Sequence, residues 1–137
     1  MIISFMLHGK AFSINKYYYK SRAVKTKEAR AWEEQIMAQL ANRPEVLEMA
    51  DMWRKNGGYF HVGMIFYYPE SVFFNSHSVV SAKTFDLSNI EKPLLDLVLN
   101  HTMGIDDRHV TRLDSRKMVG AWESIQITLE LKPYENT

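Results

Sequence analysis

The sequence predicts one small α+β domain, with a sheet of about four strands and two or three helices. Its 137 residues are enough for a single hydrophobic core, and a composition of 46% hydrophobic and 24% charged residues is typical of a folded chain. Apolar residues recur at helical spacing in some segments and at every second position in others. The helical segments stand between a first strand and a closing pair of strands, without repeats or an internal linker, so we expect residues 1–137 to form one domain.

The first half of the chain predicts a strand, a basic loop and two helices. Residues 1–7, MIISFML, are too short an apolar run to span a membrane and are expected to form the first strand. Apolar side chains at helical spacing predict a helix over 29–41, and Pro44 helps to end it. Residues 45–55 repeat an amphipathic helical pattern, which the turn-forming Gly57-Gly58 pair ends.

The second half predicts a strand, a long connection, a helix and two further strands. An aromatic and β-branched run predicts the strand over 59–68. The apolar residues of 70–83 show neither helical nor strand spacing. This segment is therefore either a lid that contacts the substrate or a packed surface loop or extra hairpin. Leucines and valines predict a helix over 89–101, and alternating patterns over 109–118 and 125–131 predict the last strands.

The composition excludes some classes of chemistry. The chain has no cysteine, which rules out disulfides, cysteine-ligated zinc and thiolate catalysis. This is compatible with a reducing, cytoplasmic location. The five histidines are scattered, without the paired spacing of a zinc site. The sequence therefore does not predict a zinc or thiol enzyme.

Basic residues gather in two parts of the chain, although the net charge is only +1. The first part holds seven of them against Glu28 alone, together with the ring run Tyr17-Tyr18-Tyr19. Lysine and arginine pair with phosphates, and aromatic rings stack on bases. Each cluster alone is also what a solvated surface would show, but together they favour a polyanionic partner. The first cluster is Lys10, Lys16, Lys20, Arg22, Lys25, Lys27 and Arg30, and the second is Arg108, Arg112, Arg116 and Lys117.

The residues best suited to catalysis lie between 86 and 107. Asp86 and Lys92 flank a predicted helix start, and Asp106-Asp107 follow that helix. Hard divalent cations prefer oxygen ligands, and Mg²⁺ typically takes only one or two carboxylates while keeping water. An acidic cluster beside a lysine therefore suits phosphodiester hydrolysis, because a metal activates water and an ammonium group stabilises the developing charge. On spacing alone, a structural turn is the commoner explanation of an Asp-Asp pair.

Three motifs follow one another across nearly the whole chain. Residues 13–18 are SINKYY, residues 86–89 are DLSN with Lys92 three positions on, and residues 104–107 are GIDD before His109-Val110. This set resembles the RusA family of Holliday junction resolvases, whose central pattern is D-x-D-N-x-x-K, a helix and then D-D. The resemblance implies a RusA-like fold with a mixed sheet, and a homodimeric, Mg²⁺-dependent endonuclease that cuts four-way DNA junctions symmetrically.

The resemblance also implies roles and partners. Asp86, Lys92 and Asp107 are expected to be catalytic, and Asp86, Asp106 and Asp107 to bind the metal, for which Mg²⁺ is expected and Mn²⁺ is expected to substitute. Branched DNA and a second copy of the chain are the expected partners, without a membrane. Family members are frequently encoded by phages or prophages, so a cytoplasmic location in a bacterial host is expected. The residues expected to contact DNA are Asn15, Lys16, Tyr17, Lys20, Arg22 and Lys25.

Position 88 departs from the family pattern, because serine stands where the family has its second aspartate. Ser88 and Glu91 match a capping box, although Pro93 would then lack a helical hydrogen bond, and a helix start at Asn89 or later is the alternative. Both side chains are also candidates for weak or water-mediated metal contacts, because a serine oxygen is neutral and Glu91 lies one helical turn away. We expect an active enzyme with altered metal affinity. A DNA-binding protein that has lost catalysis, or a nuclease for flaps or forks, is the alternative.

The spacing of the acidic motifs raises a question of reach. A straight helix over 89–101 carries the chain roughly 20 Å from its start. The six steps from His101 to Asp107 span at most about 20 Å when extended. Asp107 therefore either only just returns to Asp86 within one chain or is supplied by a partner subunit, and the sequence leaves both open.

Overall fold

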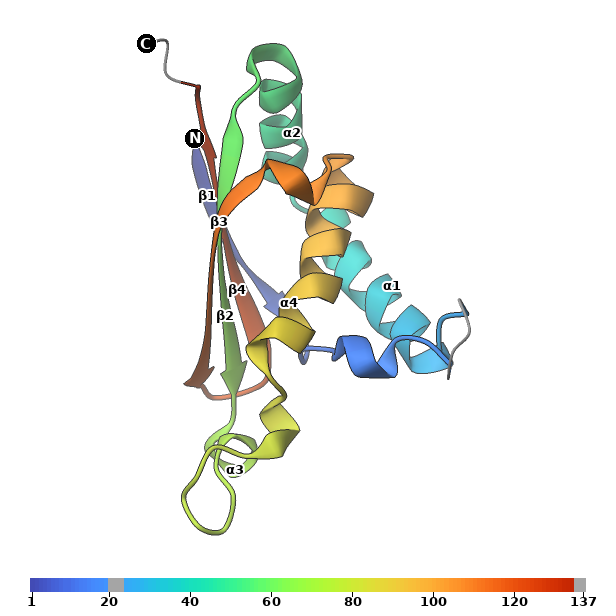
Figure 1. The fold of residues 1–137 in the computed structure, drawn as a ribbon, viewed down its shortest axis with the longest axis vertical. Helices are drawn as coiled ribbons and strands as arrows, with labels where there is room; N and C mark the ends of the chain where they lie inside the picture. Colours follow the sequence, from blue (N-terminus) through green and yellow to red (C-terminus); the bar gives the residue numbers. More distant parts are fainter. Residues whose placement is uncertain (20–23, 135–137) are drawn as a thin grey trace.

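The main helices lie against one face of a four-stranded sheet (Figure 1). The computed structural model describes residues 1–19 and 24–134. The strand order is β1-β4-β2-β3, in which β4 pairs antiparallel with both β1 and β2, and β2 pairs parallel with β3. The predicted α+β fold with a mixed sheet is confirmed. The strands are β1 (Ile2–His8), β2 (Tyr59–Tyr68), β3 (Val110–Val119) and β4 (Ser124–Lys132).

The predicted helices are all present, with bounds shifted by a few residues. Thr26 caps α1 because its side chain accepts a hydrogen bond from the N–H of Ala29. Pro44 is the first residue of α2, where a missing N–H leaves no helical bond unmade. The helices are α1 (Lys27–Ala41), α2 (Pro44–Asn56), α3 (Glu70–Phe73) and α4 (Leu87–Leu95), which continues as the π-helical η3 (Asp96–Met103); the 3₁₀ helices are η1 (Ile14–Lys16), η2 (Ala82–Thr84) and η4 (Asp107–His109).

The hydrophobic core lies between the sheet and these helices. Every second side chain of β2 and β4 is buried, as the alternating patterns predict. From the helix layer, α1 buries Trp32, Ile36 and Leu40, while α4 buries Ile90 and Leu94. Each such apolar side chain contributes roughly 1.5–3 kcal/mol when it is removed from water. One side of α4 is thus fixed on the core, which leaves its other side for polar residues.

The connection between the parallel strands β2 and β3 is long, because a tight turn cannot join parallel neighbours. It begins with α3 and a loop in which Phe74 and Val80 form an isolated bridge. The side chain of Asn75 accepts from the N–H of Val79 and so helps to close this loop. Residues 70–83 therefore form a short helix, a bridged loop and η2, and the acidic motif follows directly.

Candidate active site

The turn before α4 holds a backbone conformation that is rare for an aromatic residue. Phe85 has φ 61° and ψ 167°, a region that costs about 1–3 kcal/mol for a residue with a side chain. Lys117 of β3 fixes this turn, because its Nζ donates to the carbonyl of Phe85 at 2.9 Å and to Oγ1 of Thr84 at 3.1 Å. Tyr68 of β2 donates to the carbonyl of Thr84 at 2.8 Å. Two strands thus hold the residue that precedes Asp86.

The bond from Tyr68 is stable over a wide range of pH. Burial raises the pKa of Tyr68 to about 12, so its hydroxyl keeps its proton and remains a donor. Thr84 is fully buried and also donates to the carbonyl of Ser81 at 2.8 Å. The turn before Asp86 is therefore held by one buried and three partly buried hydrogen bonds.

Asp86, and not Ser88, is the N-cap of α4. Its φ of −76° and ψ of 141° are extended, and the helix begins at Leu87. The predicted capping box at Ser88 is therefore wrong, and so is a helix start at Asn89. The physical reason is the positive φ at Phe85, held by Lys117 and Tyr68, after which the chain enters the helix at Leu87. Ser88 is an exposed residue of the first turn, and Glu91 lies half-buried in the next turn.

A cavity of about 400 Å³ opens beside the Asp86 carboxylate. Its lining includes Asn89 from α4, Lys117 from β3 and Asn15 from η1. The neighbouring Lys16 places its Nζ 4.9 Å from the centre of the Phe85 ring. The fold thus brings the N-terminal motif and the first acidic motif together, although more than 65 residues separate them in the sequence.

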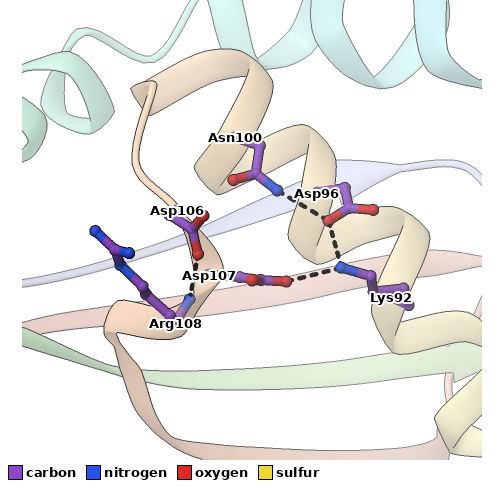
Figure 2. Close-up of polar contacts among 6 residues, drawn as sticks. All are labelled: Lys92, Asp96, Asn100, Asp106, Asp107 and Arg108. Atoms are coloured by element: carbon purple, nitrogen blue, oxygen red, sulfur yellow. Dashed lines mark hydrogen bonds and ion pairs between the residues drawn. The ribbon is translucent and has the colours of Figure 1, made fainter.

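Lys92 links the two acidic motifs (Figure 2). Its Nζ lies 2.8 Å from Oδ2 of Asp107 and 2.9 Å from Oδ1 of Asp96. Asn100 donates to the same Oδ1 of Asp96 at 3.0 Å. Sequence reasoning missed Asp96 and Asn100. The spacing of four residues from Lys92 to Asp96 and on to Asn100 was the available indication, because residues four apart share one helix face.

The charge of Lys92 is fixed by these neighbours. Its pKa is raised above the ordinary value, first by the hydrogen bond to Asp107 and then by the one to Asp96. Lys92 therefore stays an ammonium ion at neutral pH and can donate hydrogen bonds to a phosphate. It cannot serve as a general base in that state.

Asp107 returns to α4 within one chain. Gly104 ends the helix in the left-handed conformation, with φ 69° and ψ 31°. Asp106 then caps η4, because its Oδ1 accepts from the N–H of Arg108 at 2.8 Å (Figure 2). The next residue, Asp107, faces Lys92 at 2.8 Å. The chain between the helix end and Asp107 is therefore long enough to bring Asp107 back to the helix that Asp86 begins.

A family model described as Endodeoxyribonuclease RusA matches residues 10–130. The chain belongs to the RusA endodeoxyribonuclease family. No curated protein matches the chain. Among solved structures, the chain is similar to the cell wall anchor of the T6SS from Pseudomonas aeruginosa, with 13% sequence identity and a TM-score of 0.36. That match covers 96% of this chain and 81% of the other, but a similarity this low carries no argument about function.

Nucleases of the RusA family depend on a metal, so the site should offer oxygen ligands for one. Within residues 1–19 and 24–134, no three His, Asp or Glu side chains lie close enough together to hold an ion. The predicted metal ligands Asp86, Asp106 and Asp107 therefore do not form a three-carboxylate cluster in this structure. The Asp86 cavity still offers candidate oxygen ligands, because Asn15 and Asn89 line it together with Asp86. Lys117 also lines it, but its ammonium group is engaged by Thr84 and Phe85. This set fits a cation that takes one carboxylate and keeps water.

Some of the residues predicted to contact DNA in this RusA-family chain are exposed to solvent, and others are buried. Asn15 and Lys16 are exposed on η1. Tyr17 is only 5% exposed and packs edge-on against Phe12, so its ring offers no face to a base in this structure. Burial, followed by the nearby Glu33, raises its pKa well above the ordinary value. Its neighbours Tyr18 and Tyr19 are the exposed rings of this motif.

The other three residues predicted to contact DNA fall into two groups. Lys25 pairs with Glu33 at 2.9 Å and also lies 5.6 Å from the centre of the Tyr17 ring. Lys20 and Arg22 lie outside the described residues.

No helix in the described part of the chain is long and apolar enough to cross a membrane.

Proposed function

We propose that this protein is a Mg²⁺-dependent endonuclease that resolves four-way DNA junctions by paired, symmetrical cuts, as a homodimer in recombination and repair. The observation that carries the proposal is the contact between Lys92 and Asp107 at 2.8 Å, beside the helix that Asp86 begins. These three residues match the family's acidic and lysine positions. Family membership over residues 10–130 supports phosphodiester hydrolysis of DNA as the reaction.

Each residue has a role that follows from its chemistry. Asp86 would hold the metal together with the side-chain oxygens of Asn15 and Asn89, which line the same cavity. The bound ion would supply neutralisation of phosphate charge and a lowered pKa of a water ligand. Asp107 does not line that cavity, and its Oδ2 accepts from Lys92, so the role that we assign to it is to hold this lysine in place and keep it charged.

Lys92 is assigned to the charge that develops on the phosphate. It stays protonated, so it can donate a hydrogen bond to a non-bridging or leaving oxygen as negative charge grows there. Asp96 and Asp107 hold its ammonium group in place and keep it charged. Removal of one such donor usually lowers the catalytic rate about 10²–10³-fold.

The decisive test compares DNA substrates. Purified protein is incubated with a synthetic four-way junction, linear duplex, a flap and a fork, each labelled on one strand, with Mg²⁺, Mn²⁺ or EDTA. Metal-dependent nicks at symmetrical positions of the junction are expected, with little cutting of linear duplex. Preferred cutting of flaps or forks would instead assign the protein to another substrate class.

One observation favours a second candidate function. Ser88 stands where the family has an acid, and the described carboxylates form no cluster of three. A junction-binding protein without catalysis would share both features. Tight junction binding in EDTA, together with no nicking in either metal, would decide for this candidate and against the nuclease.

The geometry also predicts where each active site lies in the proposed dimer. Lys92 and Asp107 meet within one chain, so each subunit is expected to hold its own centre. Mixing Asp86→Asn chains with Asp107→Asn chains should then restore no nicking, because every centre keeps one lesion. Recovery of nicking in the mixed dimers, measured against each variant alone, would show that the centre is shared between subunits.

A further inference from the structure

A second cavity, of about 620 Å³, lies between the N-terminal segment and the first half of α1. Its base is formed by Phe12 and Trp32, whose rings stack with centres 5.6 Å apart. Trp32 is fixed there because its Nε1 donates to the carbonyl of Lys10 at 2.9 Å. Tyr18 also lines the cavity, and this residue is 47% exposed. The cavity therefore combines a buried pair of stacked rings with a half-exposed tyrosine, whose ring also contacts Tyr17 edge-on.

The charges at this cavity suit a ligand with an anionic part. Lys10 and Lys16 both line it, and neither forms an ion pair within the described residues. By contrast, Lys25 of the same segment is paired with Glu33. Glu28 brings one carboxylate to the cavity, which can accept a hydrogen bond from an amino group. The volume lies within the range of about 300–1,000 Å³ that small ligands occupy.

The cavity is also a neighbour of the Asp86 site. Asn15 lines the cavity beside Asp86, and the next residue, Lys16, lines this one. The Nζ of Lys16 reaches to within 4.9 Å of the centre of the Phe85 ring, directly before Asp86. A single strand that crosses η1 would therefore meet both cavities.

We propose that this second cavity binds one unpaired nucleobase, stacked on Tyr18, with an adjoining phosphate held by Lys10 and Lys16. A flat aromatic ligand with a nearby anion matches the exposed ring and the two unpaired ammonium groups, whereas a purely apolar ligand would leave both charges without partners. The inference rests on the proposed function for the origin of the base, which is a DNA branch point where bases leave the stack.

The test fills the cavity from the helix side. Ala31 of α1 is exposed and lines the cavity, so Ala31→Trp adds a large ring there without entering the core. The matched control is Ala38→Trp, an exposed alanine of the same helix that lies two turns away and lines a different cavity. Tyr18→Ala removes the stacking face and provides a second variant. Binding of a fluorescent tetranucleotide is measured in EDTA, alongside an abasic tetranucleotide of equal charge.

Ala31→Trp and Tyr18→Ala are expected to weaken binding of the tetranucleotide roughly 5- to 150-fold, the range for loss of one stacked base. Ala38→Trp should bind like the unaltered protein, and the abasic strand should not distinguish the variants. Equal binding by Ala31→Trp and Ala38→Trp would overturn the inference, and so would an equal loss on the abasic strand.

Nicking of the four-way junction, measured in parallel, separates the two proposals. If the unaltered protein nicks the junction while the cavity variants bind the tetranucleotide normally, the base site is wrong and the nuclease stands. If base-dependent binding is lost in both cavity variants but no junction is nicked in any metal, the base site stands and the nuclease proposal fails.

Discussion

Asp86 and Asp107 are positioned beside the same helix by two different means. Asp86 follows a strained turn at Phe85, which a buried bond from β2 and partly buried bonds from β3 hold in place. Asp107 follows a glycine turn and is held by an ion pair with Lys92, whose side chain is 52% exposed. Buried hydrogen bonds are costly to leave unmade, whereas exposed ion pairs contribute little to stability.

The two carboxylates therefore depend on different interactions: Asp86 on hydrogen bonds that stabilise the fold, and Asp107 on the charge of its partner. The Asp86 side depends on Lys117, which both fixes the turn and lines the cavity. The Asp107 side depends on charges that solvent screens, so it can rearrange when a phosphate competes with Asp107 for Lys92. We therefore expect changes near Asp86 to affect folding and activity together, and changes near Asp107 to affect activity alone.

The largest expected effect comes from removing either carboxylate. Asp86→Asn and Asp107→Asn should each lower the rate of junction nicking by at least about a hundredfold, because Asp86 is the carboxylate of the proposed metal site and Asp107 is the main partner of Lys92. Single-turnover nicking measures the rate, and binding in EDTA measures affinity for the junction. Binding should change little.

The matched control is Asp51→Asn, which removes an exposed carboxylate that pairs with Arg54 on α2. It should nick at the ordinary rate. Full activity of Asp86→Asn or Asp107→Asn would show that the roles are wrongly assigned.

The next effect tests the turn before Asp86. Lys117→Met removes the donor to the Phe85 carbonyl and to the Thr84 hydroxyl, which keeps only its bond to Ser81, so the free energy of unfolding should fall by about 1–3 kcal/mol. Nicking should slow as well, because the Asp86 turn loosens. Urea unfolding and nicking are measured on the same samples. Lys132→Met, which removes a lysine that pairs with Glu130 on β4, is the control and should change neither quantity.

A smaller effect is expected when the family's second acid is restored. Ser88→Asp adds a carboxylate to the exposed first turn of α4 without disturbing the cap, which is Asp86. The Mg²⁺ concentration for half-maximal nicking should fall roughly 3- to 10-fold, because ligand charge raises affinity for hard cations. Ser88→Asn keeps the size without the charge and should leave that concentration unchanged. Equal shifts for both variants would argue against Ser88 as the weak point of the site.

The sequence was sufficient for the helices and strands, but it left open whether the acidic motifs meet within one chain, and it did not predict the turn before Asp86. The alternating apolar residues of β4 and the helical spacing around Trp32 depend on local periodicity, which the chain carries in its own pattern. The start of α4 depends instead on a positive φ at Phe85, and no local preference predicts this for an aromatic residue. Its cause is tertiary, since Lys117 comes from a strand 32 residues away.

The burial of Tyr17 in the basic segment is another feature that the local sequence did not predict. Tyrosine beside lysines is a pattern typical of nucleic-acid contact, yet Tyr17 is buried and the adjacent Tyr18 is exposed. Which ring faces the core depends on η1, whose cap is the side chain of Ser13 accepting from the N–H of Asn15. Sequence spacing located the motif, but the direction of each side chain required the fold.

The smallest effect is expected at Asp96, the residue that sequence reasoning missed. The pKa of Lys92 is raised mainly by Asp107, so Asp96→Asn removes only the second cause and leaves the lysine charged at neutral pH. Nicking near pH 7 should therefore change less than about threefold, within what exposed pairs contribute. A raised lysine pKa means that charge is lost only as pH rises through the folded value, so the alkaline limb of the pH–rate profile should move to lower pH. Asn100→Ala leaves both carboxylates in place, so it should not move the alkaline limb of the pH–rate profile. If Asp96→Asn does not move this limb either, Asp107 alone sets the charge of Lys92.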